Sequence, residues 1–326
     1  MLHNEQRMSS ISVENISKHL NSEIGFYPVR TKIVKVPNEG WEEFCKSNNW
    51  DSTSSGAFSP RTLTAYLREE GEFGDLNLIH EFFGHGIFME YHPLEKRITA
   101  RGSVTKEIKS FSELFAIWLE FYFSKRFELK KTFWKKHRQY ENKKELFRLE
   151  ETAENLGLFA LFSMLGFPKY YGGDKVKELL EKVYGEEKIL SCSIGVIYGS
   201  RKPYSDIDLF VVSEDIIDYK NEWINIFTQT KREFEEQLKL FAVSLRDPLL
   251  HGELIFGDRS YFGLKKQQWL AQPITENAIR YNIQRHKELK EIAKTYPLGH
   301  KKRRLTESYS ASYLQNALKL KRGIRI

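Results

Sequence analysis

The fold of the second half of the chain is decided by the stretch VIYGSRKPYSDIDLFVV, residues 196–212. Its apolar and β-branched ends predict two strands, at residues 193–198 and 207–212, joined by a turn. Gly199 lets backbone amides approach a phosphate closely at the end of the first strand, and Ser200 adds a hydroxyl donor. Alternation along the second strand places Asp206 and Asp208 on one face, about 6–7 Å apart. The stretch therefore predicts a phosphate-binding turn beside two carboxylates.

Paired carboxylates of this kind suit Mg²⁺, which prefers oxygen ligands and bridges substrate phosphates. The Gly-Ser turn followed by Asp-x-Asp resembles the DNA polymerase β-like nucleotidyltransferase superfamily, including its small, stand-alone members, over about residues 174–260. The resemblance implies that Gly199 and Ser200 bind an NTP and that Asp206 and Asp208 hold Mg²⁺ as catalytic residues. The implied reaction moves a nucleoside monophosphate from the NTP to an acceptor hydroxyl and releases pyrophosphate.

One position departs from the superfamily pattern, which places a third carboxylate on the strand after a long helix. We expect that helix at residues 221–236 and that strand at residues 238–244, where Ala242 stands near the expected aspartate. The acidic residues Glu236, Asp247 and Glu253 lie nearby but not on the expected strand face. Nucleotide binding is therefore better supported than transfer.

A second motif lies in the first half, where His80-Glu81-Phe82-Phe83-Gly84-His85 has the spacing HExxxH, one residue longer than HExxH. On a regular helix, residues five apart lie about 140° around the axis. Two imidazoles so placed are badly aimed to share a tetrahedral zinc ion. A π-bulge absorbs one extra residue and brings both rings to one face, and we expect it near Gly84.

Zinc in a catalytic site needs a third protein ligand and keeps its fourth position open. Glu113, 28 residues after His85 on the next apolar helix, is the candidate for that ligand. Glu81 follows the first histidine and is the candidate general base for the water at the open position.

These residues resemble the dipeptidyl-peptidase III family of metallopeptidases, which carries HELLGH and, downstream, a helix with an EExxAE-like motif. The likeness covers about 40 residues, and Ser112 and Ile117 stand where that family has two further glutamates. It implies Zn²⁺ bound by His80, His85 and Glu113, with Glu81 as catalytic acid and base.

Other residues near these motifs have weaker roles. Glu120 lies seven residues after Glu113 and is either a group that supports a zinc ligand or a solvated side chain. His92 and Glu95 are alternative ligands in a turn-like segment. The alternative to metal binding is that the histidines and glutamates serve only the structure of a buried helix.

The overall pattern predicts an α+β chain of two unlike domains. Residues 1–170 form a mainly helical, zincin-like metallopeptidase domain, with a strand at 31–36, a Ser-rich loop at 52–59 and helices at 76–91, 111–126 and 141–165. Residues 171–275 form a small mixed-sheet nucleotidyltransferase domain, with a helix at 174–184 and a last strand at 253–256. Residues 276–326 form a basic helical extension, broken at Pro297-Leu298-Gly299.

Composition narrows the class of protein. The chain of 326 residues is 40% hydrophobic and 29% charged, which excludes a disordered or collagen-like protein. Two cysteines, no long apolar run and no apolar signal-peptide core indicate a cytoplasmic protein without a membrane partner. The net charge of +7 arises because residues 276–326 carry +9, with 13 Lys/Arg against 4 Asp/Glu, while residues 1–275 carry −2. This tail offers a surface for RNA or an acidic partner.

We therefore expect a zinc metallopeptidase-like site, acting on a peptide or protein, joined to a nucleotidyltransferase that binds Mg-NTP. Two alternatives stay open. The second domain is a nucleotide sensor that gates the peptidase, or both sites are degenerate and the chain is an antitoxin-like interaction module.

Overall fold

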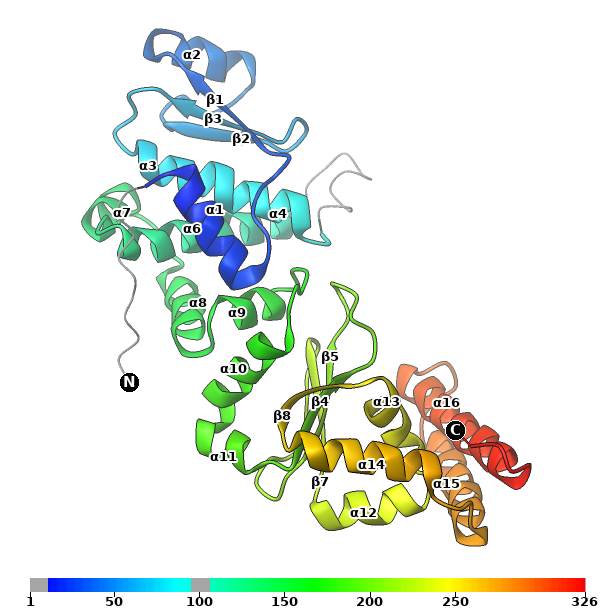
Figure 1. Cartoon of the computed structure of the whole chain (residues 1–326). Coiled ribbons are helices and arrows are strands. Elements are labelled where there is room, and N and C mark those ends of the chain that lie inside the picture. The colour runs from blue at the N-terminus through cyan, green and yellow to red at the C-terminus, as the bar shows by residue number, and fades with distance from the viewer. Residues whose placement is uncertain (1–10, 95–105, 326) are drawn as a thin grey trace. The chain divides into compact units, whose positions relative to one another are not determined.

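The structure, a computed structural model, describes residues 11–94 and 106–325. Contacts between residues divide the chain into two compact units, Met1–Tyr171 and Gly172–Ile326. Each unit combines helices with one small sheet, so the chain is mixed α+β (Figure 1). The division falls in the Tyr-Tyr-Gly-Gly segment at residues 170–173, where the sequence indicates a break in the helical pattern.

The sheet of the first unit has three strands in the order β1-β3-β2, namely β1 (Lys32–Val36), β2 (Gly56–Ser59) and β3 (Thr64–Arg68). β1 runs parallel to β3, and β2 runs antiparallel to it. β1 was expected. The prediction of a Ser-rich loop at residues 52–59 was wrong in part, because its second half forms β2. Its small and hydroxyl-bearing residues give little strand signal in the sequence, and pairing with β3 supplies the backbone hydrogen bonds.

The first unit contains one long helix, α6 (Lys106–Arg126), against which several of its helical segments pack. The expected helix at residues 76–91 is three consecutive segments, α3 (Gly74–Asn77), a π-helix η1 (Leu78–His85) and α4 (Gly86–Tyr91). The expected helix at 141–165 is two helices, because Gly157 adopts φ 88° between α8 (Lys143–Leu156) and α9 (Leu158–Met164). Three more helices are α1 (Val13–Ile24), α2 (Asn38–Ser47) and α7 (Lys130–Lys136).

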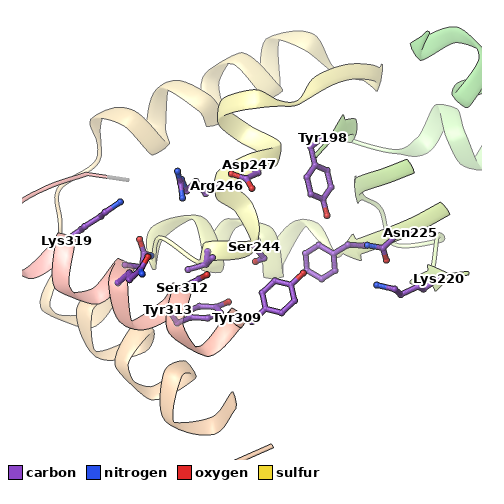
Figure 2. A pocket seen from close by; sticks show the side chains of 14 residues that line it. Tyr198, Lys220, Asn225, Ser244, Arg246, Asp247, Tyr309, Ser312, Tyr313 and Lys319 are labelled. Atoms are coloured by element: carbon purple, nitrogen blue, oxygen red, sulfur yellow. The ribbon is translucent and has the colours of Figure 1, made fainter. Parts of the chain in front are cut away.

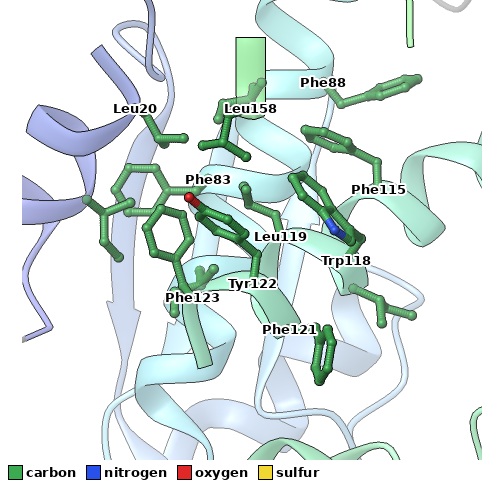
Figure 3. Packing of buried hydrophobic residues seen from close by; sticks show 14 of the residues in the cluster. Leu20, Phe83, Phe88, Phe115, Trp118, Leu119, Phe121, Tyr122, Phe123 and Leu158 are labelled. Carbon is green, nitrogen blue, oxygen red and sulfur yellow. The ribbon is translucent and has the colours of Figure 1, made fainter. Parts of the chain in front are cut away.

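Aromatic side chains fill the core of the first unit, where α6 packs against η1 (Figure 3). Phe115, Trp118 and Phe123 of α6 are completely buried, as is Phe83 of η1. Burial of each large side chain contributes about 1.5–3 kcal/mol to folding. This packing fixes the position of α6 against the helix that carries the HExxxH motif.

The second unit contains a mixed five-stranded sheet in the order β6-β7-β5-β4-β8. β4 (Ile194–Tyr198) is antiparallel to both β5 (Ile207–Val212) and β8 (Glu253–Gly257). β7 (Ile224–Gln229) runs parallel to β5, and the short β6 (Tyr219–Lys220) is antiparallel to β7. The predictions of β4, β5 and β8 are confirmed.

Two predictions between β5 and β8 were wrong. The expected helix at residues 221–236 is a strand, β7, followed by α12 (Lys231–Lys239), which starts at a capping box formed by Thr230 and Glu233. Ile224 and Ile226 alternate with polar residues, a strand pattern that the longer helical pattern obscured. The expected strand at residues 238–244 is a helix-to-helix turn, in which Phe241 has φ 50°, leading into α13 (Val243–His251).

The remaining helices of the second unit include the C-terminal segment, which the sequence marks as an extension. They are α10 (Gly173–Tyr184), α11 (Glu186–Ser191), α14 (Arg259–Ala271), α15 (Glu276–Lys294) and α16 (Lys301–Lys321). Ala278 of α15 and Leu320 of α16 are buried in the same core as the strands, so this hairpin packs on the sheet domain. Among the described residues, no helix combines the length and apolarity needed to cross a membrane.

Two candidate functional sites

The π-helix brings the two histidines of the HExxxH motif together, as the spacing predicts. The imidazole ring centroids of His80 and His85 lie 4.9 Å apart, with the rings inclined at 81°. Gly84 lies inside η1, and a Cβ atom there would come within 2.6 Å of the Cβ of Ala116 on α6. Only glycine allows this close approach between η1 and α6. The expected π-helical distortion is confirmed, although it extends over all of η1.

Glu113 of α6 approaches both histidines with its carboxylate. Oε1 lies 3.3 Å from His80 Nε2, and Oε2 lies 3.5 Å from His85 Nε2. Ligand atoms bound about 2.0–2.2 Å from a tetrahedral zinc ion are separated by about 3.3–3.6 Å. The three side chains therefore have the donor types of a His₂Glu zinc site, and both carboxylate–imidazole distances fall in this range.

A second layer of polar groups fixes the two imidazoles. His80 donates from Nδ1 to Glu120 Oε2 at 3.1 Å, and His85 Nδ1 lies 3.0 Å from Ser112 Oγ. Glu120 is fully buried and also accepts hydrogen bonds from Lys136 and His137, each at 3.0 Å. In zinc proteins, such carboxylate–histidine pairs orient the ligand ring. Glu120 is buried against His80, which excludes the alternative of a solvated side chain.

The carboxylates around His80 favour a positive charge on its imidazole. Burial acts to lower the pKa of His80, but hydrogen bonds to Glu113 and Glu120 and the charge of Glu81 outweigh it and raise the pKa to about 10. Burial acts to raise the pKa of Glu120, yet the charge of Lys136 and the hydrogen bonds from His137 and His80 lower it to about 2. The pKa of Glu113 is also lowered, because the two histidines offset its burial. Both carboxylates are therefore anionic at neutral pH.

Glu81 is buried beside the two histidines. One carboxylate oxygen of Glu81 and one nitrogen of each imidazole all lie within 4.8 Å of one another. A Cβ at Gly56, the first residue of β2, would lie 3.0 Å from Glu81 Cγ and 3.3 Å from Asn77 Cβ. The buried Nδ2 of Asn77 has no hydrogen-bond acceptor among the described residues. The site thus combines a carboxylate and an unused amide donor next to the start of a strand.

His92, one of the two weaker ligand alternatives, does not join this site. The imidazole of His92 is buried, stacks on Phe88, and lies 2.9 Å from the carbonyl oxygen of Leu165 through Nε2. Its Nδ1 accepts from the amide of Leu94, so both ring nitrogens already have partners. Glu95 lies outside the described residues.

In the second unit, the turn after β4 and the Asp-x-Asp pair lie against each other. Gly199 has φ 77°, and a Cβ there would come within 2.6 Å of Asp208 Oδ2. Ser200 Oγ accepts a hydrogen bond from Ser205 Oγ at 3.3 Å, inside the exposed turn. Burial raises the pKa of Asp208, the hydrogen bond from Asn225 opposes this shift, and the charge of Asp206 adds to it. The two aspartates are thus close enough to interact electrostatically.

Asn225, not Ala242, stands beside the Asp-x-Asp pair. It lies opposite Asp208 in the parallel pairing of β5 with β7, and its Nδ2 donates to Asp208 Oδ1 at 3.0 Å. Ala242 is fully buried in the core as the residue that precedes α13, and it does not lie on a strand. Asn225 is not among the predicted site residues, because the pattern of residues 221–236 predicted a helix. Glu253 forms an ion pair with Arg201 at 2.7 Å.

A pocket of about 460 Å³ opens beside this pair of carboxylates. Tyr198 and Asn225 line it from the sheet, α13 contributes Arg246, and α16 contributes Tyr309 and Lys319 (Figure 2). The pKa of Tyr309 is raised by burial and then by the charges of Asp208, Asp206 and Asp247, which ties the pocket to the carboxylates. Tyr309 and Tyr313 lie four residues apart on α16, a spacing that indicates one helix face. The surface that this face meets is visible only in the fold.

Comparisons with known proteins give no relative. No family model, curated protein or solved structure matches the chain.

Proposed function

We propose that the chain carries two separate active sites, a zinc-dependent peptidase site in the first unit and an Mg-NTP site of nucleotidyltransferase type in the second. The observation that carries the first is the approach of both Glu113 oxygens to the Nε2 atoms of His80 and His85. The Mg-NTP site is supported by the contact between the Gly199 turn and Asp208, next to the pocket.

In the first site, His80, His85 and Glu113 would hold the metal. A zinc ion supplies Lewis acidity, which polarises a substrate carbonyl and lowers the pKa of a water molecule. Glu81 accepts a proton from the attacking water on its carboxylate and passes it to the departing amine nitrogen. Glu120 holds the ring of His80, and Ser112 holds that of His85. Because β2 is an edge strand beginning beside Glu81, it supports an extended peptide as substrate.

Zinc content tests the first site directly. We expect about one zinc ion per chain in the wild-type protein, measured by elemental analysis after purification without an affinity tag. His85→Ala removes one of three protein ligands and is expected to lower the content to background. Equal zinc content in the two proteins would contradict the assignment of His85 as a ligand. If the well-folded wild-type protein takes up no supplied zinc, these histidines and glutamates serve only the structure of the unit.

In the second site, Asp206 and Asp208 would hold Mg²⁺, which neutralises charge on the substrate phosphates. Gly199 and Ser200 lie in the turn that approaches a phosphate, and the aromatic lining of the pocket suits a base. On β7, the strand that pairs with β5, the neutral amide of Asn225 stands beside Asp208 in place of a carboxylate. This substitution favours a second candidate function, a nucleotide sensor that binds NTP without transfer.

Labelled NTPs separate transfer from sensing. We expect α-labelled NTP to leave its label on an acceptor, either an added RNA or protein fraction or the chain itself, in the presence of Mg²⁺. Label on any acceptor excludes a pure sensor. Saturable binding of Mg-NTP with no transferred label, measured over the four common NTPs, would instead support the sensor, and the absence of both would contradict the nucleotide site.

A further inference from the structure

The pocket of the second unit has two cations that take part in no interaction within the described residues. Arg246 of α13 and Lys319 of α16 both line it, and neither side chain has a hydrogen-bond or ion-pair partner in the part of the chain that the structure describes. Figure 2 shows them on one side of the pocket, with Asn225 and Lys220 on the other. Among the described residues, two unpaired cations therefore lie at the end of the pocket away from Asn225, which contacts Asp208.

The charge of the lining favours an anionic ligand. Lys220, Arg246 and Lys319 are its three cations, and Asp247 is its one anion. The aspartates next to the pocket would be neutralised by Mg²⁺, which leaves the excess positive charge for the ligand itself. Guanidinium and ammonium groups form charge-assisted hydrogen bonds with phosphate oxygens.

Buried amides hold the two cation-bearing helices in place. Asn316 donates from Nδ2 to the carbonyl oxygen of Phe241 at 2.8 Å and to Asn282 Oδ1 at 2.8 Å. Asn282 of α15 donates to the carbonyl oxygen of Leu240 at 2.9 Å. These carbonyls belong to the turn that leads into α13, and Asn316 lies three residues before Lys319. The same network therefore positions both cations on rigid helices.

We propose that Arg246 and Lys319 form a phosphate-binding end of this pocket, which makes the C-terminal hairpin part of the nucleotide site. Its ligand spans the pocket from the Asp206 and Asp208 carboxylates to the cation pair. The phosphate comes either from the polyphosphate of an NTP or from a phosphorylated acceptor. The inference rests on the proposed nucleotide function for the ligand class, whereas the cation pair itself can be tested without it.

The test uses inorganic tripolyphosphate and Mg-ATP as probes, with the full chain, by titration calorimetry at low ionic strength. In Arg246→Gln/Lys319→Gln we expect tripolyphosphate, measured with the same Mg²⁺ concentration as ATP, to bind about 100-fold more weakly than in wild type, because two charged contacts are lost. The matched control is Lys321→Gln/Arg322→Gln, at the end of α16 and outside the pocket, with affinity unchanged. Arg246→Lys/Lys319→Arg keeps the charges and is expected to retain most of the affinity. Thermal unfolding checks that each variant is folded.

The outcomes separate the sources of the phosphate. Loss of both tripolyphosphate and Mg-ATP binding assigns the cation pair to the NTP, and loss of tripolyphosphate alone assigns it to a phosphorylated acceptor. Wild-type affinity for tripolyphosphate in the double variant, or none in the wild type, overturns the proposal. If Mg-ATP fails to bind the wild type while tripolyphosphate binds through the two cations, the proposed nucleotide function fails and the anion site stands.

Discussion

Glu81→Gln is expected to reduce peptide hydrolysis by about 10²–10⁴-fold, the usual contribution of a positioned general base. The substitution removes the proton acceptor, while the size of the side chain next to Gly56 is preserved. His80, His85 and Glu113 are unchanged, so the zinc content is expected to stay at the wild-type level. The measurement is the rate of cleavage of a pool of short synthetic peptides, followed by mass spectrometry, together with elemental analysis.

The matched control is Glu151→Gln, an exposed glutamate of α8 in the same unit, with wild-type cleavage expected. Full activity in Glu81→Gln would contradict the role of Glu81 as general base. It would not bear on the assignment of the metal ligands. Loss of zinc together with activity would instead show that Glu81 serves the binding of the metal. The two readouts therefore separate catalysis from metal retention.

Asp208→Asn is expected to weaken Mg-dependent nucleotide transfer by about 100-fold or more, because metal ions supply several kcal/mol in such reactions. The new side chain keeps an oxygen that accepts from Asn225, so the pairing of β5 with β7 is retained. What is lost is one negative charge from the metal site. The same variant is expected to lose the Mg²⁺ dependence of ATP binding in calorimetry.

Asp174→Asn, an exposed aspartate in the first turn of α10, is the control for this experiment and is expected to behave as wild type. An unchanged dependence on Mg²⁺ in Asp208→Asn would count against the Asp-x-Asp pair as the metal site. Equal loss in the control would point to a general effect on the unit.

The arrangement of the first candidate site was largely predictable, because His80, His85 and Glu113 lie on two helices with strong apolar patterns. The spacing of His80 and His85 forces a π-helix if both rings are to share one ion, and η1 has that form. What the sequence left open was the second layer. Whether Glu120 is solvated or buried depends on α7, whose Lys136 and His137 close over it, and no local signal marks that contact.

The second site was predictable only where its residues are adjacent in the sequence. Gly199, Asp206 and Asp208 lie on one hairpin, so local pattern suffices for them. Asn225 reaches Asp208 through a parallel strand pairing, and Lys319 reaches the pocket from more than one hundred residues away. Non-local contacts of this kind depend on the packing of whole elements, which periodicity does not report.

The contact between Gly84 and Ala116 sets the separation of η1 and α6 at the first site. Ala116 lies one helical turn after Glu113, and the missing Cβ of Gly84 lets η1 and α6 approach until a methyl group no longer fits between them. The width of that gap sets how far the Glu113 carboxylate stands from the two imidazoles. The metal affinity proposed for this site would then depend on a purely apolar contact, and a titration with zinc would measure how closely these two helices approach.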